Sequence, residues 1–320
     1  MQLLRLSLTD FRNYAALTWR PRARIAVLFG PNGSGKTNLL EAVSLLVPGR
    51  GLRNARTADL RRLGAADGWA VAGRFATAQG EADIGTGTQP EGPADRRVFR
   101  LDGAAPRSQA EIAARIAAVW LTPQMDRLFL EGLSGRRRFL DRLVWALEPA
   151  HAREMAAHDA AMGSRNRLLS EGRHQGRAGG GWDASWLAGL EDEMARHAVA
   201  ATAARLALVG RLNAALRAGA VGAFPAARID LLCPIAGRLA TEPALAVEDW
   251  LRAGLAANRP RDSAAGTTAL GAHRTDMGLA DAETGTPAAL ASTGEQKALL
   301  IGLILAHAAV IAEARGFAPM

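Results

Sequence analysis

Cysteine and lysine are nearly missing from this 320-residue sequence. The single cysteine, Cys233, excludes an intramolecular disulfide and a cysteine-rich zinc site, and it fits a reducing cytoplasm. The first residues are too polar for a signal peptide, and the apolar stretch 298–312 is shorter than the ~20 residues that a membrane span needs. We therefore expect a cytoplasmic protein with no membrane partner.

The chain has 39 Lys and Arg residues, but only Lys36 and Lys297 are lysines. A net charge of +8 and a sequence pI near 11.0 favour polyanions such as DNA as partners. The excess of arginine and alanine is equally what a compositionally biased genome produces. The length is typical of roughly two domains, at about 100–200 residues each.

The residues 30–37, with the sequence GPNGSGKT, match the phosphate-binding loop pattern G-x-x-x-x-G-K-[ST] at every fixed position. The apolar residues 24–29 before it predict a buried parallel strand, and residues 38–46 after it have helical spacing. Glycines let several backbone N–H groups point at one phosphate, Lys36 reaches the β- and γ-phosphates, and the Thr37 hydroxyl binds Mg²⁺. The residues predicted to hold the nucleotide are Gly30, Pro31, Asn32, Gly33, Ser34, Gly35, Lys36 and Thr37.

The rest of the chain alternates between strand and helix patterns. Strands are expected at 3–8, 15–19, 69–75, 97–101, 228–233 and 277–280, with residues 77–95 as a loop around a hairpin. Two long helical patterns, 151–169 and 185–216, predict an antiparallel helical arm, joined by the glycine-rich stretch 172–181 as a flexible loop. We expect an α/β fold with three parts: 1–110 and 226–320 form a nucleotide-binding domain, and 111–225 is an inserted arm.

Three further positions invite a functional interpretation. Arg12 lies shortly before the phosphate loop, where it either folds back onto a nucleotide or stays a solvated turn arginine. Residues 271–277 hold one His and one Asp, too few ligands for a metal ion unless a distant residue helps. Ser292 and Glu295 form a capping box, sufficient to start a helix. With Gly294, the same serine suits a second phosphate site, which reaches a phosphate loop only in a head-to-tail dimer.

These motifs, in this order, resemble the RecF family of DNA gap-repair ATPases, relatives of Rad50, SMC proteins and ABC ATPases. The resemblance rests on residues 10–14 (DFRNY), the phosphate loop, 134–141 (SGRRRFLD), 271–276 (GAHRTD) and 292–297 (STGEQK). It implies an ABC-type P-loop ATPase fold, with a mixed or parallel sheet, flanking helices and an inserted arm or lid. Residues 292–297 look like this family's signature, with Ser292 and Gly294 meeting the nucleotide of a partner subunit.

The resemblance also implies function. ATP and Mg²⁺ would be the cofactors, and Gln124 would be the Q-loop residue that senses Mg²⁺ and the attacking water. ATP-driven homodimerisation would create a clamp on single-stranded DNA and its junctions with duplex. RecR and RecO would be partners, and the protein would help RecA loading and the SOS response to DNA damage.

The family pattern also includes an apolar strand that ends in acidic residues, the Walker B motif, and we find no convincing match. The sequence looks truncated at about the point where this strand should begin. We therefore expect impaired ATP binding, and absent or very weak hydrolysis, from a family whose intact members are weak ATPases. Three alternatives stay open at this point: an ABC transporter ATPase subunit, a Rad50/SMC-type structural ATPase, and an inactive DNA-binding fragment.

Overall fold

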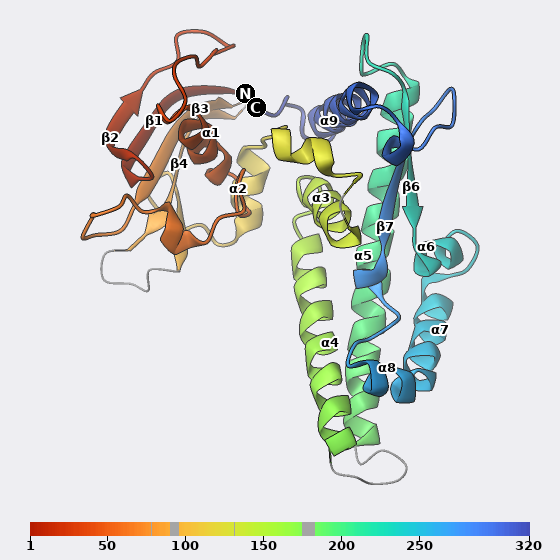
Figure 1. The fold of residues 1–320 in the computed structure, drawn as a ribbon. Coiled ribbons are helices and arrows are strands. Elements are labelled where there is room, and N and C mark those ends of the chain that lie inside the picture. The colour runs from red at the N-terminus through yellow and green to blue at the C-terminus, as the bar shows by residue number, and fades with distance from the viewer. Residues whose placement is uncertain (78, 90–95, 131, 175–182) are drawn as a thin grey trace. The chain divides into compact units, whose positions relative to one another are not determined.

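The computed structural model describes residues 1–77, 79–89, 96–130, 132–174 and 183–320. It forms two compact units (Figure 1). Unit 1 consists of Met1–Thr122 and Ala308–Met320, and unit 2 consists of Pro123–His307. The predicted three-part domain division, with boundaries near residues 110 and 225, is a different partition and stays a prediction.

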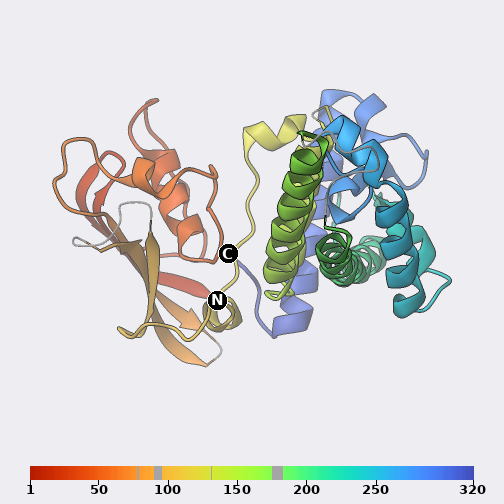
Figure 2. The same cartoon turned by 90° about the horizontal axis from the view of Figure 1, so that it is seen from below.

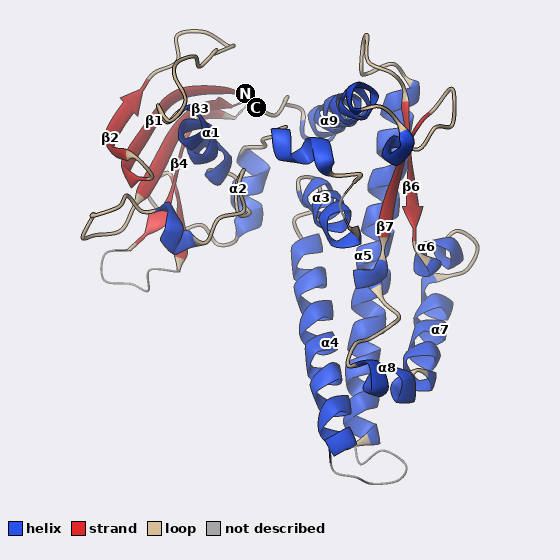
Figure 3. Cartoon of the chain, viewed as in Figure 1, coloured by secondary structure: helices blue, strands red, loops and turns tan. Residues whose placement is uncertain are grey.

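Unit 1 is built on one antiparallel sheet with the strand order β2-β1-β3-β4-β5 (Figure 3). Its strands are β1 (Gln2–Phe11), β2 (Tyr14–Trp19), β3 (Ala70–Thr77), β4 (Gly80–Thr88) and β5 (Arg97–Leu101). Helices α1 (Lys36–Leu45) and α2 (Gln109–Arg115) accompany the sheet. The strands predicted at 3–8, 15–19, 69–75 and 97–101 are confirmed, because alternating apolar residues place one face of each strand in a common core.

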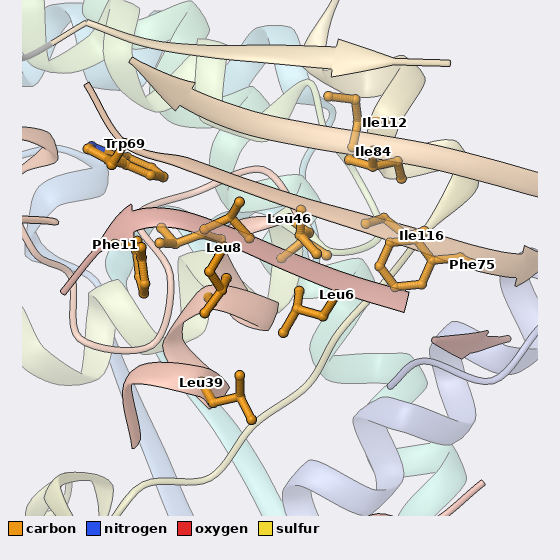
Figure 4. Packing of buried hydrophobic residues seen from close by; sticks show 14 of the residues in the cluster. Leu6, Leu8, Phe11, Leu39, Leu46, Trp69, Phe75, Ile84, Ile112 and Ile116 are labelled. Carbon is orange, nitrogen blue, oxygen red and sulfur yellow. The ribbon is translucent and has the colours of Figure 1, made fainter. Parts of the chain in front are cut away.

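The core of unit 1 lies between one face of the sheet and the two helices (Figure 4). The rings of Phe11 and Trp69 meet with their centroids 5.6 Å apart, and the Trp69 indole N–H donates to the carbonyl of Thr57 at 3.0 Å. The sheet contributes Leu6, Leu8, Phe11, Phe75 and Ile84, α1 contributes Leu39, and α2 with the residue after it contributes Ile112 and Ile116. This burial holds α1, and with it the end of the phosphate loop, against the sheet.

Arg97 of β5 fixes the other end of α1. Its guanidinium donates to the carbonyls of Leu45 at 2.8 Å, Val47 at 3.3 Å and Gly49, and its Nε donates to the Thr86 hydroxyl at 2.8 Å. These carbonyls follow the last turn of the helix, where they lack partners within it. Burial lowers the pKa of Arg97 to about 10, and the side chain stays a cation that complements the negative end of the helix dipole.

Two predictions for unit 1 are wrong. Residues 24–29 form no strand, and Ile25, Val27 and Phe29 are 82%, 79% and 91% exposed. A strand needs a neighbour to pair its backbone groups, and none of the strands in the described residues pairs with this segment. Conversely, the region 77–95 contains β4, which β3 and β5 pair on both sides. Gly87 permits this pairing, since a Cβ there would lie 2.2 Å from the Trp69 carbonyl oxygen.

Unit 2 is dominated by the antiparallel pair α4 (His151–His174) and α5 (Ala184–Arg217), which lie side by side in Figures 1 and 2. Met194, Ala195 and Ala198 of α5 are fully buried. The predicted helical arm is therefore confirmed as a helix pair, while residues 175–181 of the glycine-rich stretch lie outside the described residues. The remaining helices are α3 (Leu133–Trp145), α6 (Pro234–Leu239), α7 (Ala244–Ala257) and α8 (Arg259–Ala265). Helix α9 (Thr293–Arg315) begins in unit 2, and its residues from Ala308 onward belong to unit 1.

A two-stranded antiparallel sheet, β6 (Ala227–Leu232) with β7 (Asp276–Asp281), packs beside α5 and α3. Both strands were predicted from their apolar residues. The helices α5 and α9 are long and apolar enough to meet a length-and-composition test for a membrane span. About half of the apolar window of each is buried within the protein, as in the core helices of folded domains.

Buried ion pairs hold the helices of unit 2 together. Arg165 of α4 is fully buried and donates to Glu191 at 3.0 Å and Asp262 at 2.8 Å. Its remaining N–H groups donate to the Thr268 hydroxyl at 2.9 Å and to the Leu255 carbonyl at 2.8 Å. Because a buried charge is tolerated only when it is paired and hydrogen-bonded, this network fixes where α4, α5 and α8 meet.

Candidate functional site

The phosphate loop ends at the first residue of α1. Gly30, Gly33 and Gly35 have φ values of 146°, 82° and 96°, which side chains other than glycine rarely adopt. Gly35 is the N-cap of α1, so the backbone N–H groups of the first turn face the loop. The loop residues Pro31 to Ser34 and Thr37 are exposed. An exposed glycine turn at a helix N-terminus is the arrangement that binds phosphate.

Lys36 folds back over this loop. Its ammonium donates to the carbonyl of Gly30 at 2.8 Å and to that of Pro31 at 2.7 Å. Both acceptors are neutral, whereas a phosphate oxygen carries negative charge and forms a stronger bond with an ammonium group. The residues present therefore fit a nucleotide phosphate, with Lys36 held close to the loop by bonds that an anion can replace.

Gly35 is packed tightly against Asn13 and against Tyr14, the first residue of β2. A Cβ on Gly35 would lie 2.6 Å from the Tyr14 hydroxyl and 2.7 Å from the Asn13 amide nitrogen. Asn38 of α1 donates to the Asn13 side-chain oxygen at 2.7 Å. Any larger residue at position 35 would push these groups away, so this position requires glycine.

Arg12 belongs to this cluster, and its partner is a carboxylate of α1. Its Nε and Nη2 donate to the two carboxylate oxygens of Glu41 at 2.8 and 2.7 Å, and its Nη1 donates to the Asp59 carbonyl at 2.9 Å. Glu41 is only 1% exposed and also accepts from Arg53 at 3.2 Å. Without nucleotide, Arg12 is thus neither a solvated turn arginine nor a free cation.

Sequence reasoning missed Glu41 and Arg53. Arg53 also donates to the side-chain oxygen of Asn38 at 2.8 Å, and Asn38 directly follows Thr37 in the sequence. The available signal was Glu41 itself, a carboxylate among the buried apolar positions of α1 that needs a cationic partner. Two guanidinium groups on one carboxylate leave an excess of positive charge beside the loop, which favours an anion there.

The predicted capping box is confirmed at the start of α9. The backbone N–H of Ser292 donates to the Glu295 carboxylate at 2.8 Å, and the N–H of Glu295 lies 3.3 Å from the Ser292 hydroxyl. The Ser292 hydroxyl lowers the pKa of Glu295 by hydrogen bonding to its carboxylate. Ser292, Thr293 and Gly294 are all accessible at the protein surface, so this helix start can meet a ligand.

Gln124 is exposed in the short 3-10 turn Pro123–Arg127. Two residues later, Asp126 pairs with Lys297 at 3.1 Å, which ties this turn to the first turns of α9. Gln124 and the α9 start belong to unit 2, whereas the phosphate loop belongs to unit 1. The roles of Gln124, Ser292 and Gly294 toward a nucleotide and Mg²⁺ stay predictions.

The motif 271–276 joins α3, α5 and β7. Arg136 donates to both carboxylate oxygens of Asp276 at 2.7 and 2.9 Å, and Arg137 donates to the His273 carbonyl. Arg205, fully buried, donates to the Ala272 carbonyl at 2.8 Å and to both carboxylate oxygens of Asp141. Among the arginines 136–138, two therefore have structural partners in this motif.

Comparisons with known proteins identify a family and a fold. Residues 25–90 match the family model described as AAA domain, putative AbiEii toxin, Type IV TA system. DNA replication and repair protein RecF of Rhizobium etli (strain CIAT 652) is 44% identical over 321 residues, which cover 100% of this chain and 83% of that protein. The RecF of Agrobacterium fabrum is 46% identical over 323 residues, with the same coverage. The chain belongs to the RecF family.

Solved structures support the fold. The structure of the recombination mediator protein RecF-ATP in the RecFOR pathway superposes with a TM-score of 0.87 at 21% identity. The match covers 100% of this chain and 83% of that chain. The α/β fold class predicted from the sequence is confirmed. Neither the transporter subunit nor the Rad50/SMC-type protein gains support from these relatives.

Proposed function

We propose that this chain is an ATP-binding protein of DNA replication and repair. The observation that carries the proposal is the phosphate loop, formed by glycines with positive φ, with Lys36 resting on two neutral carbonyls and Thr37 exposed. Membership of the RecF family gives this site its context, and a related protein is described as RecF-ATP. Lys36 would hold the β- and γ-phosphates, and the Thr37 hydroxyl would bind Mg²⁺.

ATP would act by joining two copies of the chain head to tail. The accessible Ser292 and Gly294 at the start of α9 would bind the γ-phosphate on the phosphate loop of the other copy, because a helix N-terminus favours an anion. Gln124 would contact Mg²⁺ and the attacking water. In this proposal the dimer would form on ATP binding without hydrolysis. Hydrolysis, which is weak, would only separate the two copies.

Sedimentation velocity with and without ATP tests the nucleotide site. We expect ATP to shift the chain toward dimers and Lys36→Ala to abolish that shift. Arg56→Ala is a matched control, since this arginine is 84% exposed and contacts Asp59 rather than the loop. Dimerisation of the Lys36→Ala chain at the same ATP concentration would remove the proposed role of the loop.

A mixing experiment tests the head-to-tail geometry. Lys36→Ala and Ser292→Arg should each block dimerisation alone, since every composite site is then damaged. Mixed together, they leave one site with an intact loop from one copy and an intact signature from the other. We expect the mixture to form heterodimers with ATP. If the mixture stays monomeric, Ser292 does not act on the partner's nucleotide.

The ATP-bound dimer would hold single-stranded DNA and its junctions with duplex DNA without reading sequence. It would work with RecR and RecO, so that RecA loads and the SOS response follows. The high pI and exposed arginines support a phosphate-backbone interaction. We expect log K for DNA to fall linearly with log salt concentration, with a slope of several units. A flat salt response would mean that the arginine content is only compositional.

A further inference from the structure

Two histidines of unit 2 face each other with unpaired nitrogens. His158 of α4 is fully buried, and His273 is half-buried in the 3-10 turn Ala272–Arg274. Their ring centroids are 5.5 Å apart. Nε2 of His158 and Nδ1 of His273 are buried atoms without a hydrogen-bond partner in the described part of the chain. Buried polar atoms normally have a partner, so this pair calls for an occupant.

The other nitrogen of each ring is held by an acceptor. Nε2 of His273 lies 2.9 Å from the Thr268 carbonyl oxygen, and Nδ1 of His158 lies 3.2 Å from the Asp159 carboxylate. A carbonyl oxygen and a carboxylate oxygen only accept, so each of these nitrogens carries a proton. In the neutral form of each ring, Nε2 of His158 and Nδ1 of His273 therefore each carry a lone pair, and neither nitrogen can donate a hydrogen bond to the other.

Gly271 lies beside both of these nitrogens. A Cβ at this position would lie 2.9 Å from Nε2 of His158 and 3.0 Å from Nδ1 of His273. The Gly271 φ of 145° also disfavours any side chain. The absence of a Cβ therefore keeps both nitrogens open toward the same small region.

We propose that His158 and His273 form a binding site for one late first-row transition cation, Cu²⁺, Ni²⁺ or Zn²⁺. Imidazole nitrogens suit these metals, and metal-binding histidines usually donate their other N–H to a carboxylate or a backbone carbonyl, as both rings do here. No cluster of three or more His, Cys, Asp or Glu side chains in the described residues is placed to hold a metal. The remaining ligands would be water molecules.

The surroundings decide which cations bind. Arg137 donates to the His273 carbonyl and Arg274 to the Thr268 carbonyl. Burial is the largest cause that lowers the pKa of His273, and both guanidinium groups help to lower it. This positive potential weakens the binding of every cation, so only cations that bond most strongly to imidazole should bind here. We expect Cu²⁺ to bind more tightly than Zn²⁺ or Ni²⁺, and Mg²⁺ and Ca²⁺ not at all. A bound cation would join α4 to the turn that leads into β7.

Metal titration of the full chain tests this site. We expect isothermal titration to give one tight Cu²⁺ per chain, and electron paramagnetic resonance to show hyperfine coupling to two imidazole nitrogens. His158→Gln and His273→Gln should each lose this coupling pattern and bind at least about 10-fold more weakly, since one metal–imidazole bond is lost. His197→Gln is the matched control, because this part-exposed histidine contacts Glu154 on another part of α4.

Thermal unfolding supplies a second measurement. Zn²⁺ should raise the unfolding temperature of the unmodified and His197→Gln chains, by linkage, and leave both site variants unchanged. Circular dichroism without metal identifies a site variant that fails to fold. If one of His158→Gln and His273→Gln fails to fold, the other variant is used to test the site. Equal Cu²⁺ binding and spectra in the unmodified chain and a folded site variant would overturn the proposal. The absence of Cu²⁺ binding to the unmodified chain would also overturn it, and the two nitrogens would then share a water molecule.

Discussion

Replacing Arg12 with alanine should destabilise the protein in the absence of any nucleotide. The change removes two charge-assisted hydrogen bonds, of 2.8 and 2.7 Å, from a carboxylate that is 1% exposed. Breaking a buried ion pair costs about 3–5 kcal/mol. Arg53 stays on Glu41 at 3.2 Å and Arg12 itself is 21% exposed, so we expect a smaller loss of about 2–3 kcal/mol.

Hydrogen exchange followed by mass spectrometry measures this loss where it occurs. A loss of this size corresponds to amide exchange in α1 that is roughly 30- to 150-fold faster, at about 1.4 kcal/mol for each factor of ten. Peptides that cover Lys36–Leu45 report the effect, and peptides from α5 should stay unchanged.

Arg56→Ala is the control for this experiment. Arg56 also contacts an aspartate, Asp59, but its side chain is 84% exposed, so its removal should change exchange in α1 very little. If Arg12→Ala leaves nucleotide-free α1 as protected as before and lowers protection only when ATP is present, the stabilising role of the Arg12–Glu41 pair is refuted. Arg12 would then act on the nucleotide alone.

Three more changes should have distinct outcomes. Arg97→Met should cost roughly 3 kcal/mol in urea unfolding, because the carbonyls after α1 lose their buried partner, and Arg97→Lys should recover only part of it. Ser292→Ala should lower nucleotide-free stability by about 1 kcal/mol through the lost capping box, and Ser292→Thr should not. Burial raises the pKa of Asp141, but hydrogen bonds from His151 and Arg205 outweigh it and hold the pKa below its ordinary 3.8. The unfolded chain therefore takes up this proton at a higher pH than the folded chain, so the stability that ionised Asp141 contributes is lost as the pH falls below its ordinary pKa of 3.8. In urea unfolding measured over this acidic range, Asp141→Asn should make stability depend less on pH.

Local sequence signals predicted local structure well. The glycines of the phosphate loop, the Ser292–Glu295 capping box and the alternation in β1 each act over a few residues, and the structure confirms all three. The long apolar patterns also predicted the helix pair of unit 2, because an apolar face that continues over many helical turns is typical of helices packed against each other.

Relations between distant segments were not predictable from these signals. The strand expected at residues 24–29 depends on a neighbouring strand, which a run of apolar residues cannot provide. The partners of Arg12 and His273, Glu41 and His158, lie far from them in the sequence, and only the fold brings each pair together. Whether a histidine or arginine is available to a ligand depends on such partners.

We expect the exposed side chains of Ile25, Val27 and Phe29 to affect how this chain behaves at high concentration. They sit on a segment that pairs with none of the strands in the described residues, and exposed apolar side chains favour association between molecules. Self-association through this segment would rise with protein concentration, would persist without nucleotide and would be strengthened by salt, unlike the ATP-driven dimer. Dilute samples and a reference without nucleotide are therefore needed to distinguish self-association through this segment from the ATP-driven dimer.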